Sequence, residues 1–341
     1  MFEASEMKAT RDSYGETLVE LGKENPDVVV LDADLSSSTK TSLFAEAFPD
    51  RFFNVGIAEA DMMGIAAGLA RSGKIPFAST FAVFASGRAY DQVRQSIAYP
   101  GFNVKIVASH GGITVGPDGA SHQALEDIAL MRVIPGMVVI VPCDATETRL
   151  AVRAAARYHG PVYIRLGRAK VPKILRAHDD FEIGKGLVLW PQLDGRGLDD
   201  LIEDRQHSNP EEAPFAVCFV ACGVTVQPAM EAAEILEAEG ISCLVIDMAS
   251  VKPIDEDLLA TAARNSRVII TCEEHSIIGG LGSAVCETVS KTHPIPVIRL
   301  GIEDQFGQSG SAEELMEAYG LTSSNFCQQA RDFLETWWQF F

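Results

Sequence analysis

The segment SHGGITVGPDGASHQALEDIALMR, residues 109–132, is the densest group of reactive side chains in the sequence. It places His110, Asp118 and His122 among glycines, directly after an apolar, strand-like run. Histidine exchanges protons near neutral pH, so the two histidines could act as general acid and base. Metal ligation is the rival interpretation, but no third ligand stands at a standard spacing, and no metal site is predicted. Glycine-rich loops after strands are where open α/β sheets bind ligands, which makes a purely structural turn the weaker interpretation.

An acidic residue and an aromatic pair could form a second part of such a site. Glu59 stands in the first turn of a helix expected to begin near Ile57. The helix dipole favours an acid there, so an ordinary helix start is the simpler interpretation of this segment alone. Glycines and alanines at 64, 66–68 and 70 would, however, let the helix pack closely, which would partly desolvate the carboxylate and raise its pKa. Phe81 and Phe84 would be either core aromatics or a flat wall for a heterocycle.

Residues 149–176 contain eight Lys or Arg and no acid. Three of them recur at the four-residue spacing of a solvated helix face: Arg149, Arg153 and Arg157. Four others follow a strand and could hold a phosphate group: Arg165, Arg168, Lys170 and Lys173. The pattern alone favours neither interpretation over the other.

These residues need a scaffold, and the apolar pattern predicts one. In residues 1–170, strands expected at 28–31, 76–79, 104–108, 138–141 and 162–165 alternate with helices expected at 13–23, 57–72, 87–98 and 145–158. Residues 171–214 contain prolines, glycines and an acidic stretch, as in an interdomain linker with a surface loop. Alternation resumes in 215–341, with strands expected at 216–221, 242–247, 268–271 and 297–300 and helices at 227–239, 255–264 and 281–291. The sequence therefore predicts two α/β domains, each a mostly parallel sheet flanked by helices.

Composition excludes several classes of protein. The 341 residues are 47% hydrophobic and 22% charged, which is typical of a globular chain with two domains. The net charge of −19 argues against nucleic-acid binding, so an anionic substrate would need a local basic patch. No run approaches the roughly 20 apolar residues of a membrane span, and the first residues do not form a secretory signal. Seven scattered cysteines fit reduced, mostly buried thiols and a cytoplasmic location.

Together, these segments resemble the pyrimidine-binding and C-terminal domains of the transketolase family. The family's order of motifs is matched along almost the whole chain: an early TR, a DL…S turn, NVGIAE, TF..F, SH..I.VG.DG.SHQ, and an arginine after a strand. Each piece alone is weak, whereas the ordered set is specific. The resemblance implies thiamine diphosphate as cofactor, which supplies a carbanion while the protein supplies orientation and electrostatics.

The resemblance also implies roles for single residues. Glu59 would hydrogen-bond the aminopyrimidine ring nitrogen and favour the imino tautomer that takes the C2 proton. The pyrimidine pocket would be completed by five residues, with Phe84 stacking on the ring: Asp34, Leu35, Ile57, Phe81 and Phe84. The family's next aromatic is absent, because Gly87 stands in its place. The sugar hydroxyls and the reacting carbon would face His110, Asp118 and His122, and the substrate phosphate would be held by Arg11, Ser38 and Arg168.

Full-length members of this family begin with a domain whose GDG…N element holds Mg²⁺ and the diphosphate, and this sequence contains no GDG. The resemblance therefore implies an N-terminal partner subunit that carries the diphosphate and most of the contacts to Mg²⁺. Two copies of this chain would pair, giving a heterotetramer of two plus two. The assembly would transfer a two-carbon ketol unit from a ketose phosphate to an aldose phosphate.

Three other functions stay open. EEHSIIGGLGSAV, residues 273–285, resembles 1-deoxyxylulose-5-phosphate synthase and the β chain of 2-oxo acid dehydrogenases as much as transketolase. SH at 109–110 and the HQ after Ser121 favour transketolase over both. A non-catalytic scaffold or regulatory subunit is the third alternative, but the retained Glu59 and histidines do not support it.

Overall fold

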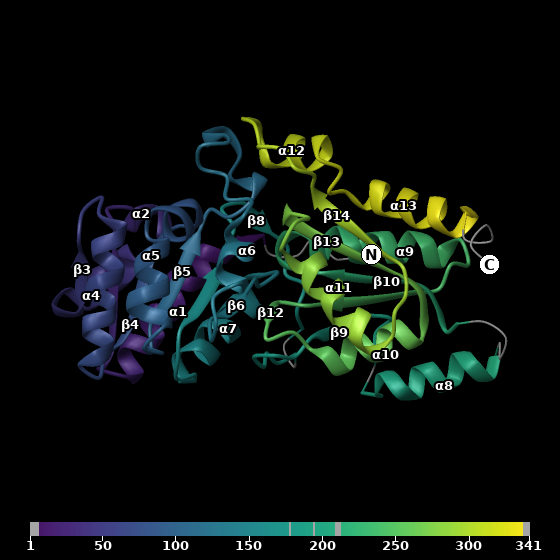
Figure 1. Cartoon of the computed structure of the whole chain (residues 1–341), viewed down its shortest axis with the longest axis horizontal. Coiled ribbons are helices and arrows are strands. Elements are labelled where there is room, and N and C mark those ends of the chain that lie inside the picture. The colour runs from purple at the N-terminus through teal and green to yellow at the C-terminus, as the bar shows by residue number, and fades with distance from the viewer. Residues whose placement is uncertain (1–6, 177–178, 194, 209–212, 337–341) are drawn as a thin grey trace.

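The computed structural model describes residues 7–176, 179–193, 195–208 and 213–336. They form two α/β domains that lie side by side along the longest axis of the molecule (Figure 1). The expected fold class is confirmed, since each domain is built on a mostly parallel sheet with helices on both faces.

The first domain is built on a seven-stranded sheet with the strand order β12-β6-β7-β5-β4-β2-β3. Its strands are β2 (Val28–Asp32), β3 (Phe52–Asn54), β4 (Ile75–Phe81), β5 (Lys105–Ser109), β6 (Val138–Ile140), β7 (Val162–Arg165) and β12 (Ser250–Lys252). All neighbours pair in parallel except β12, which runs antiparallel to β6. β2 is buried along its whole length, as parallel strands covered on both faces are.

Helices cover both faces of this sheet. α1 (Thr10–Glu24) and α7 (Ala145–Arg157) pack on one face, and α4 (Glu59–Arg71) and α6 (Asp127–Arg132) on the other. Three short helices complete the domain: α2 (Ser36–Thr39), α3 (Ser42–Ala47) and α5 (Tyr90–Gln92). A two-stranded ribbon of β1 (Lys8–Ala9) and β8 (Lys170–Val171) ties the beginning of the domain to its end.

The second domain has a five-stranded sheet with the order β14-β13-β10-β11-β9. Its strands are β9 (Leu187–Trp190), β10 (Phe215–Ala221), β11 (Cys243–Asp247), β13 (Ser266–Ser276) and β14 (Val297–Ile302). α9 (Val226–Ala238) and α13 (Ser323–Thr336) pack on one face, and α10 (Glu256–Arg264) and α11 (Leu281–Thr292) on the other. α12 (Ala312–Ala318) lies beside α13 and packs against residues 113–118 of the first domain (Figure 1).

Five short strands lie outside the expected ranges: β1, β3, β8, β9 and β12. Two of them, β9 and β12, change the domain picture. β12 belongs to the second half of the sequence but completes the first sheet. β9 lies in the segment 171–214, where a linker and surface loop were expected, and it pairs with β11 as an edge strand of the second sheet. The same segment forms α8 (Leu198–Ser208), which buries Ile202. Residues 187–190 and 198–208 therefore belong to the second domain, and residues 177–178, 194 and 209–212 lie outside the described ones.

Two expected helices differ in detail. α4 begins at Glu59, because the preceding Ala58 has the non-helical dihedrals φ −142° and ψ 63°, and Ile57 is 76% exposed. The helix expected over 87–98 contains wider π-helical turns at Phe84–Arg88 and Val93–Ala98 on either side of α5. π-helical turns are often found at functional sites.

Other expectations can be compared directly with the structure. The seven cysteines are free, and all except Cys286 are buried. Gly64 and Gly68 do not provide the close packing expected for α4, because a Cβ atom at either position would meet no atom within 4 Å. Among the described residues, no helix has both the length and the apolar character needed to cross a membrane.

Candidate active site

The predicted site residues gather at the carboxyl ends of the first sheet's strands. Leu35 follows β2, Phe81 ends β4, His110 follows β5 and Arg168 follows β7. Parallel strands bring these ends to one edge of the sheet, where open α/β sheets bind their ligands. Residues that are far apart in sequence therefore share one surface.

Phe81 lies at the centre of a stack of rings. Its ring is nearly parallel to that of His110, with centroids 3.8 Å apart and planes 20° apart. It also stacks on Phe84, with centroids 5.8 Å apart. His122 meets Phe84 edge-on, with ring centroids 5.6 Å apart. The phenylalanine pair therefore joins the two histidines, and Phe84, which is half-buried, offers a surface to a ligand.

His110 is held in an uncommon conformation. Its φ of 60° lies in the left-handed region, which few residues other than glycine adopt. Burial, together with the positive charges of Arg11 and Arg168, lowers the pKa of His110 to about 3. Ser109 Oγ lies 2.8 Å from its Nδ1. The ring is therefore neutral near neutral pH, which suits a hydrogen-bonding group better than the proton-carrying role expected from the sequence.

Two arginines lie close enough to His110 to influence its charge. Arg11 Nη1 donates to the backbone oxygen of Ser38 over 2.8 Å, while its buried Nε has no partner among the described residues. Burial lowers the pKa of Arg11, and the charge of Arg168 also lowers it. Arg168 donates to Val115 O over 2.6 Å and lies 3.5 Å from a carboxylate oxygen of Asp118. Two like charges and a free buried donor are what an anionic ligand would satisfy.

Glu59 is 4% exposed and is held by a residue that the sequence reasoning missed. Arg88 Nη1 donates to Glu59 Oε1 over 3.1 Å, and the Arg88 guanidinium lies over the Phe84 ring, 4.0 Å from its centroid. Arg88 directly follows Gly87, where the family's third aromatic is missing. The arginine thus connects the acidic and aromatic halves of the expected pyrimidine pocket.

The remaining predicted cofactor residues lie at the rim of this region. Asp34 is exposed, has a φ of 64°, and accepts a hydrogen bond from Asn54 Nδ2 over 3.2 Å. Leu35 is half-buried, and Ile57 is largely exposed. All three positions leave side chains available to a ligand or a second chain.

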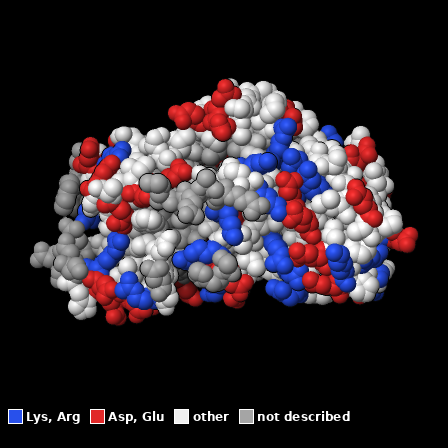
Figure 2. All heavy atoms as spheres, turned by 180° about the vertical axis from the view of Figure 1, so that it is seen from behind, with Lys and Arg blue, Asp and Glu red and all other residues white. Residues whose placement is uncertain are grey.

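The basic segment divides into residues with different surroundings. Arg149 and Arg153 on α7 pair with Glu20 and Glu24 on α1, as a solvated helix face would. Figure 2 shows basic and acidic side chains interspersed over one face of the molecule. The idea that Arg165 binds phosphate is wrong, because its side chain is 5% exposed and pairs with Asp127, 3.0 Å away.

Arg165 belongs instead to a buried network behind the histidine loop, the segment 110–123. It donates to Asp127 and to the backbone oxygens of Ala124 and Glu274. The Glu274 side chain, from β13, accepts from the backbone N–H of Thr114 over 2.9 Å and from its hydroxyl over 3.0 Å. The second domain thus directly supports a loop of the first.

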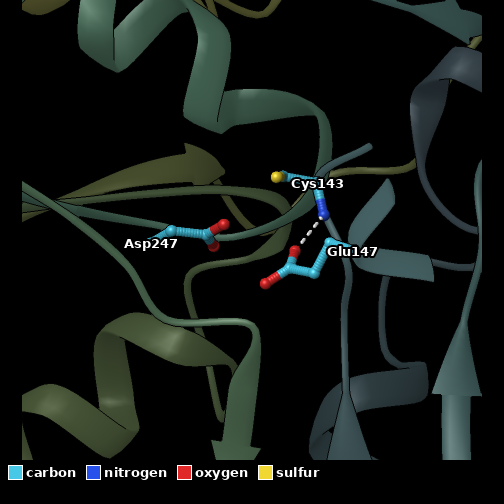
Figure 3. Close-up of side chains that lie close together, drawn as sticks. All are labelled: Cys143, Glu147 and Asp247. Carbon is cyan, nitrogen blue, oxygen red and sulfur yellow. Dashed lines mark hydrogen bonds between the residues drawn. The ribbon is translucent and has the colours of Figure 1, made fainter. Parts of the chain in front are cut away.

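A further buried group of three side chains joins the two domains. Cys143, Glu147 and Asp247 point toward one another (Figure 3), with their potential ligand atoms all within 4.8 Å. Glu147 accepts the backbone N–H of Cys143 over 2.7 Å, and the carboxylate of Asp247 faces the side chains of Cys143 and Glu147. Burial raises the pKa of Asp247 from 3.8 to about 7, and raises that of Glu147 as well. A proton shared by the two carboxyl groups would relieve their repulsion without a metal ion.

This arrangement sets the sign of a pH effect on stability. The folded chain retains a proton that the unfolded chain releases above about pH 4. The contribution of this group to stability is therefore present at low pH, falls as the pH rises toward 7, and is lost above that value.

The chain matches two family descriptions that together span most of its length. Residues 6–173 match the transketolase pyrimidine-binding domain, and residues 210–325 match the transketolase C-terminal domain. A Methanocaldococcus jannaschii protein named for the C-terminal section of transketolase is 48% identical over 325 residues, which cover 94% of this chain and 95% of that protein.

Two further relatives have the same extent. One of the subunits of an apulose-4-phosphate transketolase from Phocaeicola vulgatus is 40% identical, over 97% of this chain and 99% of that protein. A solved structure described as a split-gene transketolase in an inactive β4 tetramer is 53% identical, with a TM-score of 0.83 over 95% of this chain and 98% of that one. With both domains matched in order and relatives alike over nearly their full length, the chain belongs to the transketolase family.

Proposed function

We propose that this chain is the C-terminal subunit of a thiamine diphosphate-dependent transketolase that moves a two-carbon ketol unit from a ketose phosphate to an aldose phosphate. The observation that carries the proposal is the convergence of His110, His122, Arg11 and Arg168 beside the Phe81–Phe84 pair. Polar groups for a sugar, charges for a phosphate and a flat wall for a heterocycle thus share one sheet edge.

The chain's own residues fit the pyrimidine half of the cofactor. Arg88 presents a planar group with N–H donors to the ring of Phe84 and to the carboxylate of Glu59. An aminopyrimidine ring is likewise planar and bears N–H groups, so it matches the same two contacts once Arg88 moves aside. When bound, thiamine diphosphate supplies the nucleophilic carbon for ketol transfer. Glu59 would hold a proton at the pyrimidine ring nitrogen, while Leu35, Ile57 and Asp34 border the ring.

The chain's polar residues would bind and orient the sugar. A neutral His110 can donate to or accept from a hydroxyl group, and His122 and Asp118 lie on the same loop. Arg168, Arg11 and the Ser38 region would hold the phosphate through charge-assisted hydrogen bonds. The relative from Phocaeicola vulgatus is named for a phosphorylated sugar, which supports this substrate class.

We propose that the diphosphate and Mg²⁺ are held mainly by a partner subunit. The relatives are named as a C-terminal section, as one subunit of a transketolase and as a split-gene transketolase, and the last is described as an inactive tetramer of β chains. The free thiols fit a reducing compartment such as the cytoplasm.

A second copy of this chain would cover the exposed face around α4. That face carries Phe53, Ile57 and Ile65, which are 38%, 76% and 37% exposed, beside the open positions of Gly64 and Gly68. Small and apolar residues on one face suit a close subunit contact. The active assembly would then contain two copies of this chain and two of the partner.

The test is to assemble the chain with a diphosphate-binding transketolase subunit, the cofactor and Mg²⁺, and to assay two reactions. Ketol transfer from a ketose phosphate to an aldose phosphate would support the proposal. Decarboxylation of a 2-oxo acid would instead support a dehydrogenase β chain or a 1-deoxyxylulose-5-phosphate synthase-like activity. If the assembled, cofactor-loaded complex shows neither reaction, the chain is a scaffold or regulatory subunit.

A further inference from the structure

The histidine loop contains one short 3-10 helix, Ile113–Asp118, which is kinked at Gly116. Gly112, Gly116 and Gly119 have φ values of 80°, 82° and 73°, so the chain turns repeatedly between β5 and α6. Such a loop has many conformations in isolation, and ordering it requires bonds from outside. The proposed substrate residues Asp118 and His122 lie within it.

Gln123 directly follows His122 and is 4% exposed. Its Nε2 donates to Gln308 O in the second domain over 2.9 Å and to Ile113 O in the same loop over 3.2 Å. Gly116 O also lies 3.5 Å from this nitrogen. The amide nitrogen faces three carbonyl oxygens. Exchanging the amide nitrogen and oxygen would place Oε1 against these carbonyl oxygens, which cannot donate a hydrogen bond, so the observed orientation is favoured.

The second domain approaches the loop very closely at two glycines. A Cβ atom at Gly307 would stand 1.8 Å from Gln123 Oε1, and one at Gly119 would stand 2.6 Å from Ser309 Oγ. The segment that makes these contacts is itself held in place, since Ser311 caps α12 and Tyr319 donates to Phe306 O over 3.1 Å. Segment 306–311, although most of it is exposed, is therefore anchored by these two contacts where it meets the loop.

We infer that Gln123 is a positioning residue, which fixes Asp118 and His122 at the active site by tying the histidine loop to the second domain at 307–308. Glu274, which holds Thr114, is the second attachment point of the same loop. The inference rests on the proposed function for its catalytic consequence, while the attachment itself is a property of the chain. It gives the second domain a part in substrate binding, although none of the proposed cofactor or substrate residues belongs to that domain.

The test perturbs the contact from both sides. Gly307→Ala pushes on Gln123 from the second domain, and Gln123→Met keeps the side-chain length but removes the N–H donors. Gly197→Ala is the matched control, because a Cβ there would meet Asp200 Oδ2 at 3.6 Å and Asp199 N at 3.9 Å, both ordinary contact distances. All three are made in the full chain and assembled with the partner subunit for kinetics.

The first measurement is amide hydrogen exchange of the full chain, which needs no catalytic activity. Exchange should rise at least about tenfold in residues 113–122 of both variants and stay unchanged in the two sheets and in the control. Unchanged exchange in 113–122 would overturn the inference. A rise throughout the chain would show that Gln123 stabilises the whole fold, which would also overturn a local positioning role.

The second measurement separates substrate handling from cofactor activation. The variants should lower kcat/KM for the ketose phosphate by about 10- to 100-fold, as misplaced groups do. Proton exchange at the cofactor's C2 should stay within about twofold of wild type, since Glu59, Phe81 and Phe84 are untouched. Equal losses in both quantities would refute positioning. Lack of ketol transfer by the wild-type assembly would count against the proposed function alone, because the hydrogen-exchange result would still decide the attachment.

Discussion

Replacing Arg168 with alanine tests whether the paired arginines bind a phosphate. Two unit charges 4 Å apart interact by about 4 kcal/mol at an effective dielectric constant of about 20. Arg168 already pairs with Asp118 at 3.5 Å, and its side chain is 34% exposed, so binding phosphate gives up a contact worth about 1 kcal/mol or less. The net loss is therefore about 2–3 kcal/mol, which corresponds to an increase of roughly 30- to 150-fold in KM for a phosphorylated sugar.

The assay compares phosphorylated and unphosphorylated substrates in the assembled enzyme. Arg168→Ala should leave KM for the unphosphorylated analogue nearly unchanged, and Arg149→Ala, on the solvated face of α7, should change neither. A second readout needs no substrate: the charge of Arg168 helps to lower the pKa of His110, so the pKa should rise in the variant when followed by NMR. An equal rise in KM for both substrates would mean that Arg168 acts only on the structure, and an unchanged KM would refute the phosphate site.

Three further predictions concern other parts of the molecule. Glu59→Gln should keep the fold but slow C2 proton exchange in the assembled enzyme by orders of magnitude, since the proton contact is lost; wild-type rates would contradict the role of Glu59. The chain without its partner should bind cofactor and Mg²⁺ more weakly than micromolar by calorimetry and show no turnover, whereas micromolar binding with turnover would exclude a shared site. In urea unfolding between pH 5 and pH 8, wild type should lose about 1–4 kcal/mol more stability than Asp247→Asn, because the folded chain keeps a proton on Asp247 that the unfolded chain has already released. Asp247→Asn should flatten this slope, and equal slopes would show that the carboxyl group does not titrate in this range.

The sequence predicts the sheets and several site residues correctly where the signal lies within one continuous segment of the chain. Alternating apolar runs predicted both parallel sheets, because strands such as β2 and β10 are continuous and buried. The ordered motifs identified Phe81, His110 and His122, which the fold brings together at one sheet edge. The functions of these residues stay predictions until they are tested.

The sequence does not predict a residue's environment where its contact partner is distant in the chain. Arg165 and Arg168 look alike in the basic segment, yet Arg165 is neutralised by Asp127 and by Glu274, which is 109 residues away. The sequence shows that Gly87 replaces an aromatic residue. It does not show that the next residue, Arg88, contacts Glu59 and Phe84. β9 and β12, with four and three residues, are too short to show a period, and pairing across the chain defines them.

β12 also determines how the protein can be made and divided. On the ribosome, the first sheet stays one strand short until residue 252 has emerged, more than a hundred residues after β6. A fragment ending at residue 173, where the match to the pyrimidine-binding domain ends, would leave the edge of β6 without its partner. The unpaired amide and carbonyl groups of β6 would then be open to strands of neighbouring molecules, so such a fragment should tend to aggregate. The two domains therefore have separate sheets, but the first domain cannot complete its sheet until much of the second has been synthesised.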